Sequence, residues 1–183
     1  YGAAMVALHA VTQRQQPAVA PSVAWLAVRA LRERYELGEP ATDGAGLLQR
    51  ACAIALSATG VSLVGGAFWL VLDEGLIAAD ALHDTTEREG PLLILRGRAR
   101  ASTSDSALFR GPRAAVVALA AELLGYRATR DVSDLGRALM LGPVARRKAR
   151  TGVLAARARH IHGRALDFAF DQTGVIRDLD RAI

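Results

Sequence analysis

The chain has 183 residues, enough for a substantial hydrophobic core. Its 23 Lys and Arg outnumber its 18 Asp and Glu, so the formal net charge is +5 and the favoured partners are acidic: nucleic acid, anionic lipid or an acidic subunit. The single cysteine, Cys52, excludes an intramolecular disulfide and a Cys-based metal cluster, and we expect it to be a buried small hydrophobe. The sequence starts at Tyr1 without Met, and we expect that a preceding segment has been removed.

Residues 1–46 predict an N-terminal helical segment and a linker. Residues 1–11 are apolar enough for a short helix, and a polar connector punctuated by prolines follows. From Val23 to Tyr35 apolar side chains recur with helical period, and Ser22 can cap this helix. The glycines and the proline between Gly38 and Gly46 predict a linker.

Residues 51–72 form a long segment without a charged side chain. As an α helix this segment would be about 33 Å long at about 1.5 Å per residue, which is enough to cross a bilayer core of about 30 Å. Trp69 lies near one end, and the small residues within the segment suit helix packing in lipid. We therefore expect a mainly α protein with one transmembrane helix within residues 47–74.

The same segment also fits a structure outside the membrane. Residues 47–56 can form an amphipathic helix, and Val61–Val64, Gly65-Gly66 and Ala67–Leu72 have the pattern of a β-hairpin with a two-residue turn. This alternative is an α+β fold with a short hairpin at 60–72. Periodicity alone does not separate the two alternatives.

The location of the protein depends on the same choice. Arg32, Arg34 and Arg50 precede the uncharged segment closely, whereas only Arg88 follows it closely. By the positive-inside rule, a single-pass protein would have its N-terminus on the cytoplasmic side of a bacterial inner membrane or its organellar equivalent. If the segment does not span lipid, we expect a cytoplasmic protein.

Residues 75–183 predict a basic, mainly helical region. Residues 76–82 suggest a helix, and Leu92–Leu95, followed by arginines on alternate positions, suggest an exposed strand or arm. Gly111-Pro112 starts a helix over Arg113–Leu124 with Gly125 as its stop. Asp131–Leu141 predicts another helix, capped by Asp131 or Ser133 and broken at Gly142-Pro143.

Basic residues dominate the last predicted helix, Val144 to about Phe170. The range Leu135–Leu166 contains eight basic residues and no acidic one. On one continuous helix, four of the arginines would fall within about 40° of one another and form a stripe that can follow phosphate groups. The residues that we expect to bind an anionic partner are Arg146, Arg147, Lys148, Arg150, Arg157 and Arg164.

The sequence lacks the usual sets of catalytic residues. Gly60–Val64 fails the nucleophile-elbow pattern because Val64 stands where a second glycine is needed, and no phosphate-binding loop or Rossmann glycine triplet is present. We interpret the carboxylate pairs Asp73-Glu74 and Glu87/Glu89 as solvated charge. His160 and His162 would lie about 200° apart on a helix, so we expect a solvated or phosphate-facing role and no metal ligation.

Residues Leu47–Gly66 resemble the opening helix and strand of bacterial GAF sensor domains. Glu89-Gly90-Pro91 is similar to an acidic-Gly-Pro turn that some of these domains carry. The resemblance implies a ligand-sensing regulatory domain built on a sheet. The arginine-rich segments that follow depart from the sensor pattern.

These observations favour a non-catalytic protein without cofactor or metal. We expect an accessory or assembly subunit of a larger membrane protein complex, with a bioenergetic complex as one candidate. Its partners would be other subunits and anionic lipid or an acidic subunit. The alternatives are a helical nucleic-acid-binding subunit of a ribonucleoprotein or DNA complex and a GAF-like ligand-sensing domain.

Overall fold

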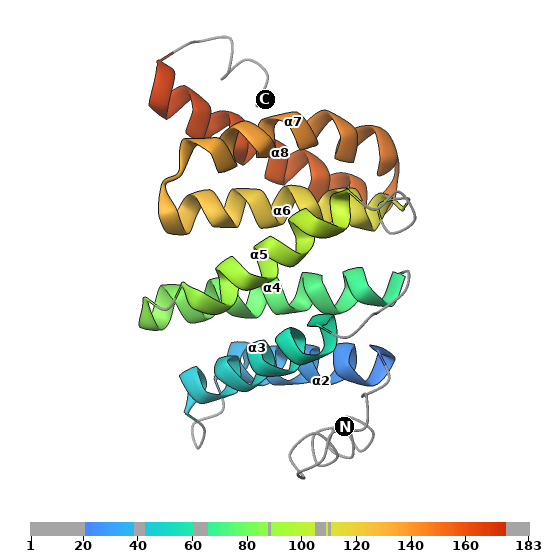
Figure 1. The fold of residues 1–183 in the computed structure, drawn as a ribbon, viewed down its shortest axis with the longest axis vertical. Helices are drawn as coiled ribbons and strands as arrows, with labels where there is room; N and C mark the ends of the chain where they lie inside the picture. The colour runs from blue at the N-terminus through green and yellow to red at the C-terminus, as the bar shows by residue number, and fades with distance from the viewer. Residues whose placement is uncertain are drawn as a thin grey trace. The chain divides into compact units, whose positions relative to one another are not determined.

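A computed structural model describes residues 21–38, 43–60, 66–87, 89–104, 109 and 111–174. These residues form seven α helices and no strand, which confirms the predicted mainly α class (Figure 1). The helices are α2 (Pro21–Glu36), α3 (Gly44–Gly60), α4 (Gly66–Thr86), α5 (Gly90–Thr103), α6 (Pro112–Thr129), α7 (Val132–Lys148) and α8 (Gly152–Thr173).

The chain divides into two compact units, residues 1–98 and 99–183, here called unit 1 and unit 2. These limits differ from the three segments 1–46, 47–74 and 75–183 expected from the sequence. The helix expected over residues 1–11 and the first hairpin strand, Val61–Val64, lie outside the described residues.

In unit 1 the helices α2, α3 and α4 pack against one another. The uncharged segment 51–72 is not one helix, because α3 ends at Gly60 and α4 begins at Gly66. Many apolar side chains of α4 are buried in the unit: Phe68, Trp69, Val71, Leu72, Leu76, Ala78, Ala79 and Leu82. A long apolar run is typical of either a protein core or a membrane span, and the sequence alone does not distinguish the two.

No helix within the described parts of the chain is both long enough and apolar enough to cross a membrane. The expected transmembrane helix is therefore unsupported. The carboxylate pair Asp73-Glu74 lies inside α4. Asp73 is buried, and Glu74 accepts a hydrogen bond of 2.9 Å from Arg32 Nε of α2. The interpretation of this carboxylate pair as solvated is wrong.

The two strands that the sequence suggested within the described residues are helical. Ala67–Leu72 belongs to α4, so the hairpin at 60–72 is not formed, and Leu92–Leu95 belongs to α5. Leu92 and Leu95 are both buried at helical spacing, and Arg98, one turn further, donates to the Leu56 carbonyl and the Thr59 hydroxyl at the end of α3. The sheet that a GAF-like domain requires is absent from the described residues.

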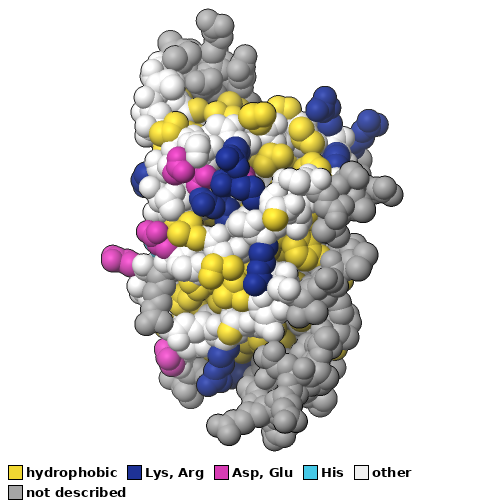
Figure 2. All heavy atoms as spheres, viewed as in Figure 1, with side chains coloured by type: hydrophobic (Ala, Val, Ile, Leu, Met, Phe, Trp, Pro, Cys, Tyr) yellow, Lys and Arg dark blue, Asp and Glu magenta, His cyan; other side chains and the backbone are white. Residues whose placement is uncertain are grey.

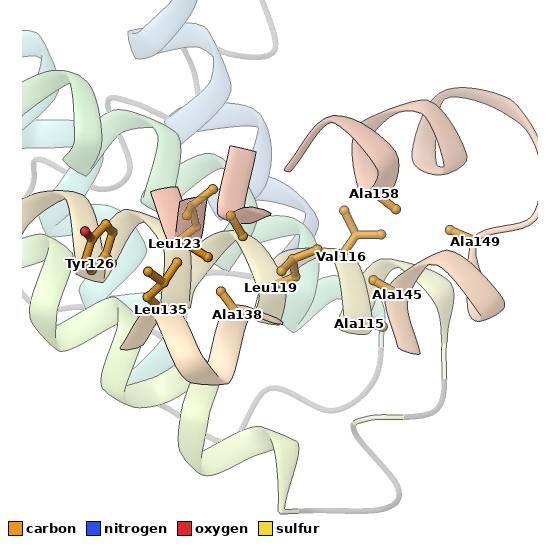
Figure 3. Packing of buried hydrophobic residues seen from close by; sticks show 12 residues of the cluster. Ala115, Val116, Leu119, Leu123, Tyr126, Leu135, Ala138, Ala145, Ala149 and Ala158 are labelled. Carbon is orange, nitrogen blue, oxygen red and sulfur yellow. The ribbon is translucent and has the colours of Figure 1, made fainter. Parts of the chain in front are cut away.

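In unit 2 the helices α6, α7 and α8 pack against one another pairwise. Tyr126 of α6 and Phe168 of α8 make an edge-to-face contact, with ring centroids 5.4 Å apart. Small side chains on α7 and α8 allow the helices to approach closely. Figure 3 shows the core cluster, which includes Ala115, Val116, Leu119 and Leu123 of α6, Leu135, Ala138 and Ala145 of α7, and Ala158, Ala165 and Ala169 of α8.

Two of the helix ends in unit 2 differ from the predicted ones, and one agrees with the prediction. Helix α6 continues past the predicted stop at Gly125, and Arg130, in the left-handed conformation, donates its N–H to the Tyr126 carbonyl. Asp131 caps α7 as predicted, accepting from the Ser133 N–H at 2.9 Å. Helix α7 then continues through Pro143, whose cost of about 3 kcal/mol in a helix interior is offset by the packing of the following turns.

Candidate anion-binding site

Residues 144–170, which were predicted to form one basic helix, form the end of α7 and most of α8. Helix α7 ends at Lys148, Ala149 and Arg150 are not helical, and α8 begins at Gly152, which has a positive φ of 69°. The prediction of one continuous basic helix is therefore wrong. The stripe of Arg146, Arg150, Arg157 and Arg164 does not exist in the predicted form, because its helical phase is lost at this break.

The break allows α8 to pack against α7, and this arrangement produces a basic pocket. Its volume is about 350 Å³, at the lower end of the range of about 300–1,000 Å³ for ligand clefts. Arg146 and Arg147 come from α7 and Arg159 comes from α8, and the side chains of all three are exposed. Pro143 and Ala149 complete the lining, which contains no carboxylate. We call this the arginine pocket.

The other residues predicted to bind an anionic partner lie outside the pocket lining. Lys148 donates to the Phe109 carbonyl at 2.6 Å, and its ammonium lies 4.3 Å from the centre of the Phe109 ring. Arg150 is exposed beyond the end of α7. Arg157 and Arg164 lie on α8, and Arg164 stacks over the Phe168 ring. Figure 2 shows exposed Lys and Arg side chains over the end of unit 2 where α7 leads into α8.

His162 is buried beside the arginine pocket. Its ring packs against Gly142, where an added Cβ would lie only 2.0 Å from His162 Cδ2. Burial lowers the pKa of His162, and the positive charge of Arg146 lowers it further. The solvated role expected for His162 is wrong, whereas His160 is exposed.

A second charged cluster in unit 2 is structural. Arg100 donates to Glu122 at 2.8 Å and to Asp134 at 2.7 Å, and both carboxylates are buried. The hydrogen bond to Glu122 is the largest cause of the raised pKa of Arg100, so the guanidinium stays charged. The sequence signals for this cluster were Glu122 within the apolar run of α6 and Asp134 within the first turn of α7. Neither was recognised.

The arrangement of the arginine pocket is suited to binding anions. Three guanidinium groups can donate to several anionic oxygens at once, because each has a planar fork of N–H groups. No group of three or more His, Cys, Asp or Glu within the described ranges is placed to hold a metal ion. Cys52 is buried as predicted, and burial raises the pKa of its thiol to about 11, so it is a poor nucleophile.

Sequence reasoning found two of the three arginines. Arg159 lies about 200° around α8 from Arg157, so the assumed stripe left it out. Only the folding of α8 against α7 brings Arg159 to the same pocket as Arg146 and Arg147. Comparison with protein families, with curated proteins and with solved structures finds no match to this chain.

Proposed function

We propose that this chain is a non-catalytic helical module that binds the phosphate groups of nucleic acid through unit 2. The observation that carries the proposal is the arginine pocket, in which two helices contribute three exposed guanidinium groups and no carboxylate. Arginine is the residue best suited to phosphate recognition, because its fork of donors matches two oxygens of one phosphate. Like charges held together repel one another unless an anion neutralises them.

The predicted membrane subunit depended on the uncharged segment 51–72. Much of that segment is accounted for by α3 and α4, whose apolar side chains form the core of unit 1. The arginine pocket does not depend on that segment. The anionic partner is therefore the part of the prediction that the described residues support best.

Docking onto an acidic subunit of a larger complex is a second candidate. Large apolar side chains are exposed in the same unit: Val132 at 63%, Met140 at 76% and Val153 at 84%. Protein interfaces often combine exposed apolar side chains with arginines. Under this candidate the module would be an accessory or assembly subunit.

Fluorescence anisotropy with a short labelled DNA or RNA duplex, over a series of KCl concentrations, tests the proposal. Binding should weaken linearly on a log–log plot, with a slope of about −0.9 for each phosphate neutralised. Arg147→Ala should reduce the magnitude of this slope by about 1. Arg29→Ala is the control with the same charge change, because Arg29 is already paired with Glu33 at 2.7 Å in unit 1.

Competition experiments distinguish nucleic acid from an acidic subunit as the partner. Unlabelled duplex should displace the labelled duplex far better than poly-glutamate at equal charge. Equal displacement by poly-glutamate would favour the acidic subunit. Absence of binding at low salt, or equal binding by wild type and Arg147→Ala, would overturn the proposal.

A further inference from the structure

We propose that the arginine pocket is a discrete site for one phosphate monoester, and that it takes the terminal 5′-phosphate of the bound nucleic acid. This inference rests on the proposed function and specifies which chemical group of the nucleic acid is recognised. Such a pocket would hold one phosphate in a defined geometry, whereas a basic surface would attract any phosphate.

The number of donors points to a monoester. An internal phosphodiester carries one negative charge, and its neighbours along the strand are spread over a surface. A terminal phosphate carries about −1.5 to −2 charges and three strong acceptor oxygens, like the phosphate of a phosphorylated side chain. Three guanidinium groups line one concavity, so their positive charge can neutralise such a group fully and each of its three oxygens can accept from a different arginine.

The shape of the pocket points to a chain end. The arginines line a concavity of about 350 Å³, and an internal phosphate that enters it must bring the strand on both of its sides. A terminal phosphate has a strand on one side only, so all three arginines can surround it while the rest of the nucleic acid remains outside. Exposed Arg150, next to the lining residue Ala149, is placed to contact that remaining strand.

Packing on the protein side holds the pocket in shape. Next to the lining residue Pro143, α7 contacts α8, where the ring of His162 lies against Gly142. Ala149 is buried, and the adjacent Lys148 is fixed by its hydrogen bond to the Phe109 carbonyl. Arg150 Nε donates to the Arg147 carbonyl at 3.3 Å, which links the connecting residues to the last turn of α7. A site on packed helices needs little reordering when its ligand binds.

His162 provides a spectroscopic reporter of occupancy. The charge of Arg146 holds the pKa of this imidazole down, in addition to burial. A phosphate dianion in the pocket offsets that charge, so the pKa of His162 should rise when the site is filled. A phosphate bound elsewhere on the basic surface would not have this effect.

The test compares two duplexes of identical sequence, one with 5′-phosphate and one with 5′-hydroxyl ends, using the full chain. The phosphorylated duplex should bind about tenfold more tightly, the gain expected for one added charge-assisted contact. Arg159→Ala should remove this preference, and Arg159→Lys should keep part of it because a point charge replaces the fork. Arg137→Ala, an exposed position on α7 outside the pocket lining, should leave the ratio of the two affinities unchanged.

Inorganic phosphate provides the second readout. Its addition should raise the pKa of His162, followed by ¹H–¹⁵N NMR of the imidazole, in the wild type and not in Arg159→Ala. Equal binding of the two duplexes together with an unchanged His162 pKa would overturn the inference and leave nucleic-acid binding intact. A response to inorganic phosphate without any preference for the phosphorylated duplex would assign the site to free phosphate and overturn the 5′-end assignment. If neither duplex binds, the proposed function itself fails.

Discussion

The backbone of Gly142 packs against the imidazole of His162 so closely that a Cβ at residue 142 would lie 2.0 Å from His162 Cδ2. This contact joins α7 to α8 beside the arginine pocket. The glycine supplies the space that the ring requires.

Gly142→Ala should therefore destabilise the protein, because the new methyl group overlaps a buried ring. We expect a loss of about 1–3 kcal/mol in the free energy of unfolding, measured by urea denaturation followed by circular dichroism. Gly136→Ala on the same helix is the matched control, since an added Cβ meets nothing within 4 Å there. The control should gain about 0.5–1 kcal/mol. Similar values for both variants would contradict the contact.

The sequence predicted the helical class well, and the partners of each helix poorly. Periodicity identified α2, and Asp131, one of the two capping residues predicted for α7, does cap it, because both signals are local. The apolar run that continues into α4 suggested a membrane span, since an apolar run does not say whether lipid or protein covers it. Likewise, Arg146 and Arg159 meet only after α7 and α8 pack, and no local pattern encodes that meeting.

In unit 1, α3 and α4 approach each other closely at Gly75, where an added Cβ would lie 2.5 Å from Ala55 Cβ. Gly75→Ala should lower the free energy of unfolding by about 1–3 kcal/mol. Ala55→Gly should restore the space, so the double variant should be more stable than the sum of the two single changes, by about 1 kcal/mol in a double-mutant cycle. Gly97→Ala, where an added Cβ meets nothing within 4 Å, is the control. Simple additivity would contradict the packing of these helices.

Arg100 holds two buried carboxylates, Glu122 and Asp134, at 2.8 and 2.7 Å. Arg100→Met should destabilise the protein by about 3–5 kcal/mol, because two buried carboxylates lose the guanidinium that they share. Adding Glu122→Gln should recover part of that loss. Exposed Arg137→Met is the control and should change the stability by less than about 0.5 kcal/mol. Chemical denaturation measures all four proteins, and equal stability of the Arg100 and Arg137 variants would show that the cluster is not structural.

Cys52 should make stability depend on pH in the alkaline range. Burial raises the pKa of its thiol from 9.0 to about 11, so the unfolded chain ionises first. The associated stability is fully present below pH 9 and is lost as the pH rises toward 11, at about 1.4 kcal/mol per pH unit. Cys52→Ala should lack this part of the slope when urea denaturation is repeated over the range. Parallel curves for the two proteins would count against a buried thiol.

His162 should make stability depend on pH in the acidic range, with the opposite sign. Burial, and then the charge of Arg146, lower its pKa below the ordinary value of 6.5, so the unfolded chain takes up a proton before the folded protein does. The stability from the neutral imidazole is present above pH 6.5 and is lost as the pH falls through the lower pKa of the folded state.

Arg146→Gln should raise the pKa of His162 while leaving it below 6.5, because burial remains. ¹H–¹⁵N NMR titration measures the shift, and His160→Gln assigns the two imidazoles. Arg147→Gln has the same charge change on the adjacent residue and should leave the His162 pKa nearly unchanged, since Arg147 is not among the groups that shift it. Equal shifts in the two variants would mean that His162 responds to the net charge of unit 2 and that its proximity to Arg146 has no special effect.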